Sequence, residues 1–294
     1  MENLNACPVC GSTKFEKFLD CIDYTVSKKA FSIVSCSSCN LHFTNPRPGA
    51  AEIGPYYESK DYISHSNSKT GLINRVYQTV RSYSLKKKVE LINSMASKGA
   101  LLDIGCGTGE FLFAAKNNGW NVKGVEPSPA ARKMAIDNYK LDIVGEESIN
   151  TLNPASFEII TMWHVLEHVH ELKKRIGELN KLLKSGGVAV IAVPNMNSYD
   201  AKHYKEHWAA YDVPRHLYHF TAPVIKKAFE QEGFRFDRSL PMKFDSFYVS
   251  MLSEKYLRGK NGLLQAFLTG MKSNNAAGND PEKYSSVIYV FKKA

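Results

Sequence analysis

The chain has 294 residues, of which 44% are hydrophobic and 23% are charged, as in globular domains with a core of normal size. No stretch approaches the roughly 18–20 apolar residues of a membrane span, and the first residues lack the pattern of a signal peptide, so we expect a cytoplasmic protein without a transmembrane segment. The formal net charge of +9 at pH 7 favours an anionic small molecule, nucleic acid or membrane surface as partner, although a solvated basic surface explains it equally well.

Four of the six cysteines form two C-x-x-C pairs near the start of the chain. In a chain without a secretory signal, such pairs indicate a metal site rather than disulfides. Cys7, Cys10, Cys36 and Cys39 are spaced so that four thiolates can close a tetrahedral zinc site. A closed site of this kind is structural, because no coordination position stays open. We therefore predict a zinc ribbon over residues 1–48 that either caps the active site or recognises substrate.

A helical connector that caps the active site is predicted over residues 49–97. Apolar residues near helical spacing indicate a helix at 72–95 within it. Aromatic and histidine side chains ahead of this helix either fold over the site or belong to a plain linker; they are Tyr56, Tyr57, Tyr62 and His65.

From residue 98 to residue 294 short apolar strands alternate with helices. This alternation predicts a mostly parallel sheet with helices on both faces, and ligands of such sheets lie beyond the carboxyl ends of the strands. The stretch at about 242–283 is too long for a hairpin loop and is predicted to be a helical insertion, which forms an apolar wall for the acceptor, a dimer contact or simple packing. Strands are predicted at residues 100–104, 121–125, 141–144, 157–162, 188–193, 234–240 and 286–291, and helices at 110–118, 129–139, 171–183, 221–231, 247–257 and 263–271.

A glycine-rich loop, residues 103–109, joins the first of these strands to the first helix. Glycine can adopt positive φ and lets the backbone come close to a ligand. Glu126 ends the next strand, 21 positions after Gly105, where a carboxylate can accept hydrogen bonds from two ribose hydroxyls. The spacing differs from the G-x-G-x-x-G of dinucleotide sites, so no pyrophosphate grip is implied.

The sequence D-I-G-C-G-T-G in this loop and V-E-P-S at residues 125–128 resemble the first two motifs of the class I S-adenosylmethionine-dependent methyltransferases, over about residues 98–240. The resemblance implies an α/β, Rossmann-like, doubly wound seven-stranded sheet. It also implies that the loop passes under the methionine part of the cofactor, that Asp103 orients water or the amino group, and that Glu126 holds the ribose. Cofactor contacts are thereby expected from Asp103, Gly105, Cys106, Gly107, Gly109, Glu126 and Pro127, and from Glu146 or Glu147 near the adenine.

The segment after the fourth strand, M-W-H-V-L-E-H-V at residues 162–169, resembles the ubiquinone-type O-methyltransferases. Trp163 is expected to pack on the cofactor or to wall the substrate site. His164 lies at the catalytic edge of the sheet, as a cofactor contact and as a candidate base for a substrate proton, whereas His168 is expected to be structural. The H-x-x-E-H pattern also matches zinc peptidases, but those need one helix that carries both ligands, and this segment straddles a strand end.

Residues 207–221 follow the fifth strand and are rich in aromatic residues and histidine. Asp212, Arg215 and His216 are catalytic candidates as base, anion clamp and orienting group, with His216 the strongest of the three. The alternative is a packed loop that leads into the next helix.

These features favour S-adenosylmethionine-dependent O-methylation of a small-molecule, sugar or lipid-linked biosynthetic intermediate. A ribosomal or transfer RNA methyltransferase is the alternative enzyme, weakened because the sequence lacks the Asn/Asp-Pro-Pro-Tyr signature of base amino-group methylation. A third possibility is a zinc-ribbon binding module with an inert cofactor site. The sequence determines neither the acceptor nor the oligomeric state.

Overall fold

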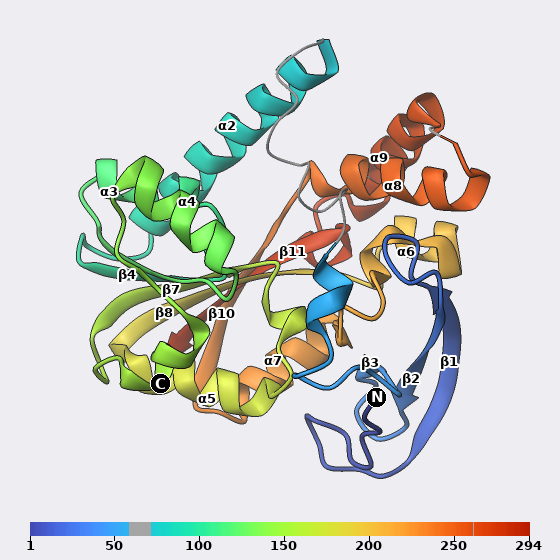
Figure 1. Cartoon of the computed structure of the whole chain (residues 1–294), viewed down its shortest axis with the longest axis horizontal. Coiled ribbons are helices and arrows are strands. Elements are labelled where there is room, and N and C mark those ends of the chain that lie inside the picture. The colour runs from blue at the N-terminus through green and yellow to red at the C-terminus, as the bar shows by residue number, and fades with distance from the viewer. Residues whose placement is uncertain (59–71, 261) are drawn as a thin grey trace.

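The computed structural model describes residues 1–58, 72–260 and 262–294 of the chain, with side chains described from residue 78 onward in the helix that begins at Leu72. A large mixed sheet with helices on both faces forms one half of the molecule, and a smaller sheet from the N-terminal residues lies beside it (Figure 1). Tyr62 and His65 lie outside the described residues.

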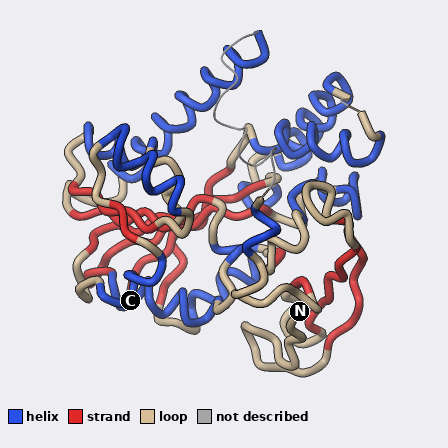
Figure 2. Tube along the Cα trace, in the orientation of Figure 1, coloured by secondary structure: helices blue, strands red, loops and turns tan. Residues whose placement is uncertain are grey.

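The large sheet has the strand order β10-β11-β8-β7-β4-β5-β6. Five neighbouring strands pair in parallel, in the order β8-β7-β4-β5-β6, whereas β11 pairs antiparallel with both β8 and β10. This arrangement confirms the predicted Rossmann-like seven-stranded sheet (Figure 2). The strands are β4 (Ala100–Ile104), β5 (Asn121–Val125), β6 (Ile143–Val144), β7 (Phe157–Trp163), β8 (Leu183–Pro194), β10 (Phe234–Pro241) and β11 (Ser286–Lys293).

Helices cover both faces of this sheet because successive strand residues point to opposite sides. Leu101 packs in the cluster formed with α2 and α3, whereas Leu102 packs in the cluster formed with α5 and α7. Both leucines are fully buried, as expected of a strand covered on two faces. The helices are α2 (Leu72–Asn93), α3 (Glu110–Asn117) and α4 (Pro129–Tyr139) on one face, and α5 (Leu172–Leu182) and α7 (Ala222–Glu230) on the other (Figure 1).

The smaller sheet has the order β1-β2-β3-β9 and draws its last strand from far along the chain. β1 (Phe15–Ile22), β2 (Ala30–Cys36) and β3 (His42–Thr44) are N-terminal, whereas β9 (Tyr218–His219) lies just ahead of α7. Phe43 is the register partner of Tyr218 in the antiparallel pair of β3 with β9. A two-residue strand has no periodicity of its own, so the sequence did not predict β9. The N-terminal unit is therefore continuous with the rest of the molecule through a shared sheet.

The predicted helical insertion is present as α8 (Asp245–Arg258) and α9 (Leu263–Ala277), which pack on the unpredicted helix α6 (Tyr199–Tyr204). Asp200 of α6 is fully buried and accepts hydrogen bonds from Trp208 Nε1 at 2.8 Å, Ser273 Oγ at 2.7 Å and Ser285 Oγ at 2.6 Å. This carboxylate thus joins α6, α9 and the start of β11. Short 3-10 helices are η1 (Gly54–Tyr57), η3 (Glu146–Thr151), η4 (Leu166–His168), η5 (Lys205–His207), η6 (Ala209–Tyr211) and η7 (Pro281–Lys283).

Among the described residues, every helix is too short or too polar to cross a bilayer.

Replacing Asp200 with alanine is expected to lower the free energy of unfolding by about 3 kcal/mol or more, because three buried donors lose their acceptor. Urea denaturation measures this loss. Asp137→Ala removes a carboxylate that is 54% exposed and pairs with Lys133, so it should cost much less stability than Asp200→Ala. Equal losses for the two variants would contradict the bridging role of Asp200.

Candidate functional site

The glycine loop turns sharply between β4 and α3. Gly105, Gly107 and Gly109 have φ values of +71°, +55° and +85°, which favour glycine. A Cβ on Gly105 would lie 2.4 Å from Val165 Cγ2, whereas a Cβ on Gly107 would meet nothing within 4 Å. The loop thus packs closely on the segment after β7 and borders open space at Gly107. A Cβ on Gly109 would lie 2.9 Å from Ala135 Cβ, so that glycine serves packing on α4.

Glu126 follows β5 and holds the glycine loop from the side. Glu126 is 7% exposed. Its Oε2 accepts a hydrogen bond from Gly107 N at 2.8 Å, and its Oε1 accepts one from Ser128 N at 2.9 Å. Burial raises the pKa of Glu126, and these two amides oppose that rise. A carboxylate has about four acceptor positions, so two remain for the hydroxyls of a diol. Pro127, which follows, is exposed.

The two acidic residues after β6 differ in their surroundings. Glu146 forms an ion pair with Arg175 and lies near enough to Glu126 to contribute to the raised pKa of that carboxyl. Glu147 is exposed. Of the two residues, Glu146 therefore fits better beside a ligand that Glu126 holds.

Asp103 lies one residue before the end of β4 and is 2% exposed. It accepts a hydrogen bond from Thr161 Oγ1 at 2.6 Å, and burial raises the pKa of Asp103 to about 7. The predicted contact Cys106 is buried, and its Sγ lies where a side chain on Gly124 would stand, so its thiol packs inside the protein. Cys106 therefore contributes only its backbone to the surface of the glycine loop.

Trp163 and a lysine from α2 meet beside Asp103. Lys88 Nζ lies 4.2 Å from the ring centroid of Trp163, and its charge acts on the Asp103 carboxyl. Trp163 Nε1 is buried and has no hydrogen-bond partner among the described residues. The ring of Trp163 therefore makes its cation–π contact with Lys88. Lys88 is not among the site residues that the sequence predicts, although the helical period of α2 could have indicated that it points inward.

His164 lies between two carboxylates and has the left-handed φ of +56°. Its Nε2 is 3.0 Å from Asp245 Oδ2 and its Nδ1 is 3.4 Å from Glu167 Oε1. Burial lowers the pKa of His164, but the two carboxylates outweigh it and raise the pKa to about 10. An imidazolium has no lone pair for a substrate proton, so the geometry does not support His164 as a base. Asp245, from the insertion, had no signal in the sequence.

His216 and His168 stack edge to face with ring centroids 4.6 Å apart. His216 is 9% exposed, and its Nδ1 lies 2.8 Å from Ala210 O, so Nδ1 carries a hydrogen and Nε2 is the ring nitrogen left for another partner. His168 Nδ1 lies 3.0 Å from Arg215 O and 3.0 Å from Tyr57 Oη. Burial, followed by the charge of His216, lowers the pKa of His168 to about 4, so this ring is neutral.

Arg215 is 2% exposed and its donors are engaged within the protein. Nε and Nη2 donate to Asp212 at 2.9 and 2.6 Å, Nη2 also reaches Asp23 at 3.1 Å, and Nη1 donates to Tyr56 O at 2.9 Å. The geometry therefore does not support Arg215 as an anion clamp. Burial raises the pKa of Asp212. The hydrogen bonds and charge of Arg215 lower it by more, so the net pKa is lowered and Asp212 is a weak base. Asp212 Oδ2 lies 4.0 Å from His216 Nε2 and can orient that ring.

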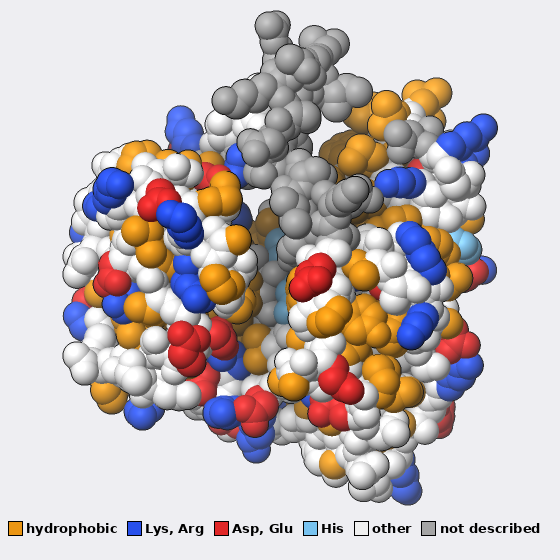
Figure 3. All heavy atoms as spheres, in the orientation of Figure 1, with side chains coloured by type: hydrophobic (Ala, Val, Ile, Leu, Met, Phe, Trp, Pro, Cys, Tyr) orange, Lys and Arg blue, Asp and Glu red, His pale blue; other side chains and the backbone are white. Residues whose placement is uncertain are grey.

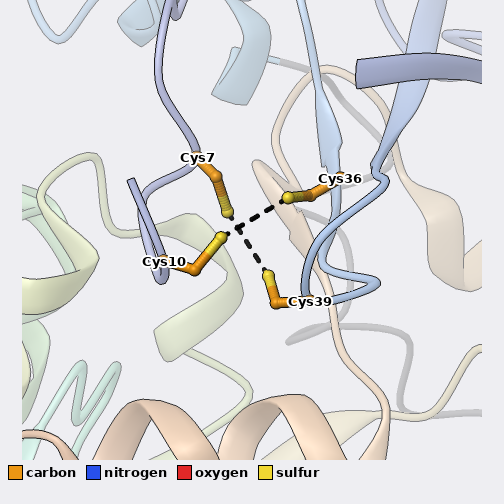
Figure 4. Close-up of side chains that lie close together, drawn as sticks. All are labelled: Cys7, Cys10, Cys36 and Cys39. Carbon is orange, nitrogen blue, oxygen red and sulfur yellow. Dashed lines mark hydrogen bonds between the residues drawn. The ribbon is translucent and has the colours of Figure 1, made fainter. Parts of the chain in front are cut away.

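The four N-terminal cysteines gather as the sequence predicted (Figure 4). Sγ atoms of Cys7 and Cys39 lie 3.5 Å apart, as do those of Cys10 and Cys36, and all four are free thiols. Burial raises the pKa of Cys36, but the amides of Ser38 and Cys39 lower it to about 7. The cluster therefore has the donor set of a tetrahedral thiolate site.

Histidine side chains are visible in the furrow that separates the two halves of one molecular face (Figure 3). The furrow lies between the large sheet with its helices and the half that contains the cysteine cluster.

A family model described as "Methyltransferase domain" matches residues 77–238. This range is more than half of the 294 residues. The chain therefore belongs to this methyltransferase domain family.

Two curated relatives are ubiquinone biosynthesis O-methyltransferases. The protein from Nitrosomonas europaea is 28% identical over 118 residues, which are 37% of this chain and 48% of the relative. The protein from Rickettsia akari is 25% identical over 142 residues, which are 45% of this chain and 57% of the relative. The chain thus spans about half the length of these relatives.

A solved structure from Galdieria sulphuraria, described as a candidate sarcosine dimethylglycine methyltransferase, superposes with a TM-score of 0.52. The superposition covers 75% of this chain and 88% of the Galdieria sulphuraria chain, at 14% sequence identity. This likeness shows the α/β Rossmann-like methyltransferase fold.

The raised pKa of His164 predicts a loss of stability at alkaline pH. Its charged form stabilises the folded state fully below the ordinary pKa of 6.5, and this contribution is lost as pH rises through about 10. Between pH 7 and pH 10 the wild type should therefore lose more unfolding free energy in urea denaturation than His164→Gln. Parallel pH profiles would contradict the assignment.

Proposed function

We propose that the protein transfers a methyl group from S-adenosylmethionine to an oxygen of a small-molecule, sugar or lipid-linked biosynthetic intermediate. The observation that carries this proposal is the Glu126 carboxylate, buried after β5 and hydrogen-bonded to Gly107 N of the open glycine loop. Such a carboxylate with spare acceptor positions suits a ribose diol. Membership of the methyltransferase domain family and the names of the two relatives support the same activity.

The residues divide into two groups by the part of the reaction they would serve. S-adenosylmethionine, when bound, supplies the methyl group on a sulfonium. Glu126 and the backbone at Gly107 would hold its ribose and methionine parts, Glu146 would lie near the adenine, and Asp103 with Trp163 would lie at the charged end. Asp103 and Glu126 are buried, and burial strengthens their interactions with a charged or hydrogen-bonding ligand.

The acceptor would lie near His216, whose Nε2 lone pair is kept available by the bond from Nδ1 to Ala210 O. Methyl transfer to a hydroxyl needs the oxygen in line with the sulfonium and a group that assists loss of its proton. His216 would supply that assistance, with Asp212 orienting its ring. Arg215 would act as a positioning residue through Asp212.

We also propose that the four cysteines bind a structural zinc ion and that residues 1–48 form a zinc ribbon, followed by a connector at 49–97 and the methyltransferase domain at 98–294. The gathered thiols support this. Tyr57 Oη, which contacts His168, supports a capping role for the connector.

Glu126→Gln is expected to weaken S-adenosylhomocysteine binding by about 10- to 100-fold, because hydrogen bonds to a charged group contribute about 1.5–3 kcal/mol. Calorimetric titration measures this. Asp142→Asn, at a side chain that is 63% exposed, is the control and should leave affinity unchanged. Unchanged affinity in Glu126→Gln would remove Glu126 from the cofactor site.

Cys36→Ser is expected to lose the cluster's zinc and to lower the melting temperature, because zinc bound to the folded state stabilises it. Metal analysis and thermal unfolding of the full chain measure the two effects. A variant that keeps both the zinc content and the melting temperature of the wild type would show that the cluster is no zinc site.

The acceptor class can be tested with methyl-labelled S-adenosylmethionine and panels of phenols, sugars, prenylated quinol precursors and RNA. Label transfer to a hydroxyl compound is expected, and His216→Ala should slow it about 100-fold or more while leaving S-adenosylhomocysteine binding intact. Transfer to RNA alone would overturn the small-molecule proposal, and binding of the cofactor without transfer to any acceptor would favour an inert binding module.

A further inference from the structure

Three side chains meet at the ends of the strands, and the proposed methyl transfer gives a role to only one of them, His216. Glu167, His168 and His216 each place one ligand atom so that all three atoms lie within 4.8 Å of one another. The first two belong to η4 after β7, and His216 comes from the loop ahead of β9. Two imidazoles and one carboxylate are a donor set that binds divalent transition metals.

The two histidine rings are already set as metal ligands require. Nδ1 of His168 faces Arg215 O at 3.0 Å, and Nδ1 of His216 faces Ala210 O at 2.8 Å. A carbonyl only accepts, so each Nδ1 carries a hydrogen, and in the neutral ring the lone pair is on Nε2. Metal-binding histidines commonly donate their other ring N–H to a backbone carbonyl, which fixes both tautomer and orientation.

Glu167 supplies an independent observation. Its side chain is fully buried, and neither carboxylate oxygen accepts a hydrogen bond from the part of the chain that the structure describes. Its nearest cation, His164 Nδ1, lies 3.4 Å from Oε1, longer than an ordinary charged hydrogen bond. Charged His164 therefore balances Glu167 from the Oε1 side only, and Oε2 has no partner among the described residues. A cation between this carboxylate and the two rings would supply one.

We propose that Glu167, His168 and His216 form a binding site for one divalent transition-metal ion, such as Zn²⁺, separate from the cysteine cluster. Ligand atoms of one ion at ~2.1 Å lie about 3–4 Å apart, so small side-chain rotations close this cluster. The H-x-x-E-H sequence thereby contributes two ligands, Glu167 and His168, from one 3-10 turn and not from the α-helix of zinc peptidases.

Three protein ligands leave coordination positions open, which is the pattern of catalytic sites. The role of this ion rests on the proposed function: an acceptor hydroxyl bound to the ion would lose its proton to solvent more readily, because a cation lowers the pKa of a bound hydroxyl. His216 Nε2 then assists proton loss through the ion instead of accepting the proton itself. The two roles use the same lone pair and exclude each other in one molecule.

The test compares zinc content in full-length variants dialysed to equilibrium against micromolar Zn²⁺. Glu167→Gln and His216→Gln should each hold one zinc ion per chain fewer than the wild type. The control Glu171→Gln, at a side chain that is 68% exposed in the next segment, should match the wild type. This difference does not depend on whether the cysteine cluster also binds zinc. Equal zinc content in the wild type and in folded Glu167→Gln would overturn the proposal.

A Co²⁺ titration of the wild type keeps the proposal falsifiable where the variants do not fold. Cobalt bound to thiolates gives intense near-ultraviolet charge-transfer absorption, whereas cobalt bound to imidazole and carboxylate gives only weak visible bands. A bound equivalent that adds visible bands without charge transfer is expected, and binding that shows thiolate absorption alone would refute the site. S-adenosylhomocysteine binding, measured on the same samples, reports separately on the proposed methyltransferase function.

Discussion

A buried arginine fixes the arrangement of the two sheets and of the loop between them. Arg215 is 2% exposed and binds Asp212 of its own loop, Asp23 of the N-terminal unit and the carbonyl of Tyr56. A buried charge that loses one partner costs several kcal/mol, so these segments stay together. This network also positions His216, which follows Arg215 in the chain. The N-terminal unit therefore helps to position the loop that carries His216.

The site has two electrostatic halves. On the cofactor side, burial raises the pKa of both Asp103 and Glu126, and the charge of Lys88 opposes that rise at Asp103. A cationic ligand would favour the ionised forms of these carboxylates for the same reason. On the other side, His168 is neutral and stacks on His216. In the proposed function, the first half would hold the positively charged cofactor and the second would assist loss of the acceptor's proton.

His164 joins these halves to the helical insertion. Its left-handed backbone places the imidazole between Glu167 and Asp245 of α8. Residues held in sparsely populated conformations concentrate at functional sites, where the surrounding structure determines them. Here the two carboxylates stabilise a charged ring, so the insertion helps to position the segment after β7. This contact gives the C-terminal helices a role beyond covering the core.

The sequence by itself determined what depends on local pattern: the alternating strands and helices, the glycine loop with Glu126, and the spacing of the cysteines. Each of these follows from periodicity or from short separations along the chain. Only the tertiary structure decided that β9 completes the N-terminal sheet, that Asp245 pairs with His164, and that Arg215 is consumed by internal ion pairs. These contacts join residues far apart in the chain, and their formation depends on how the packed elements bring side chains together, which no local pattern records.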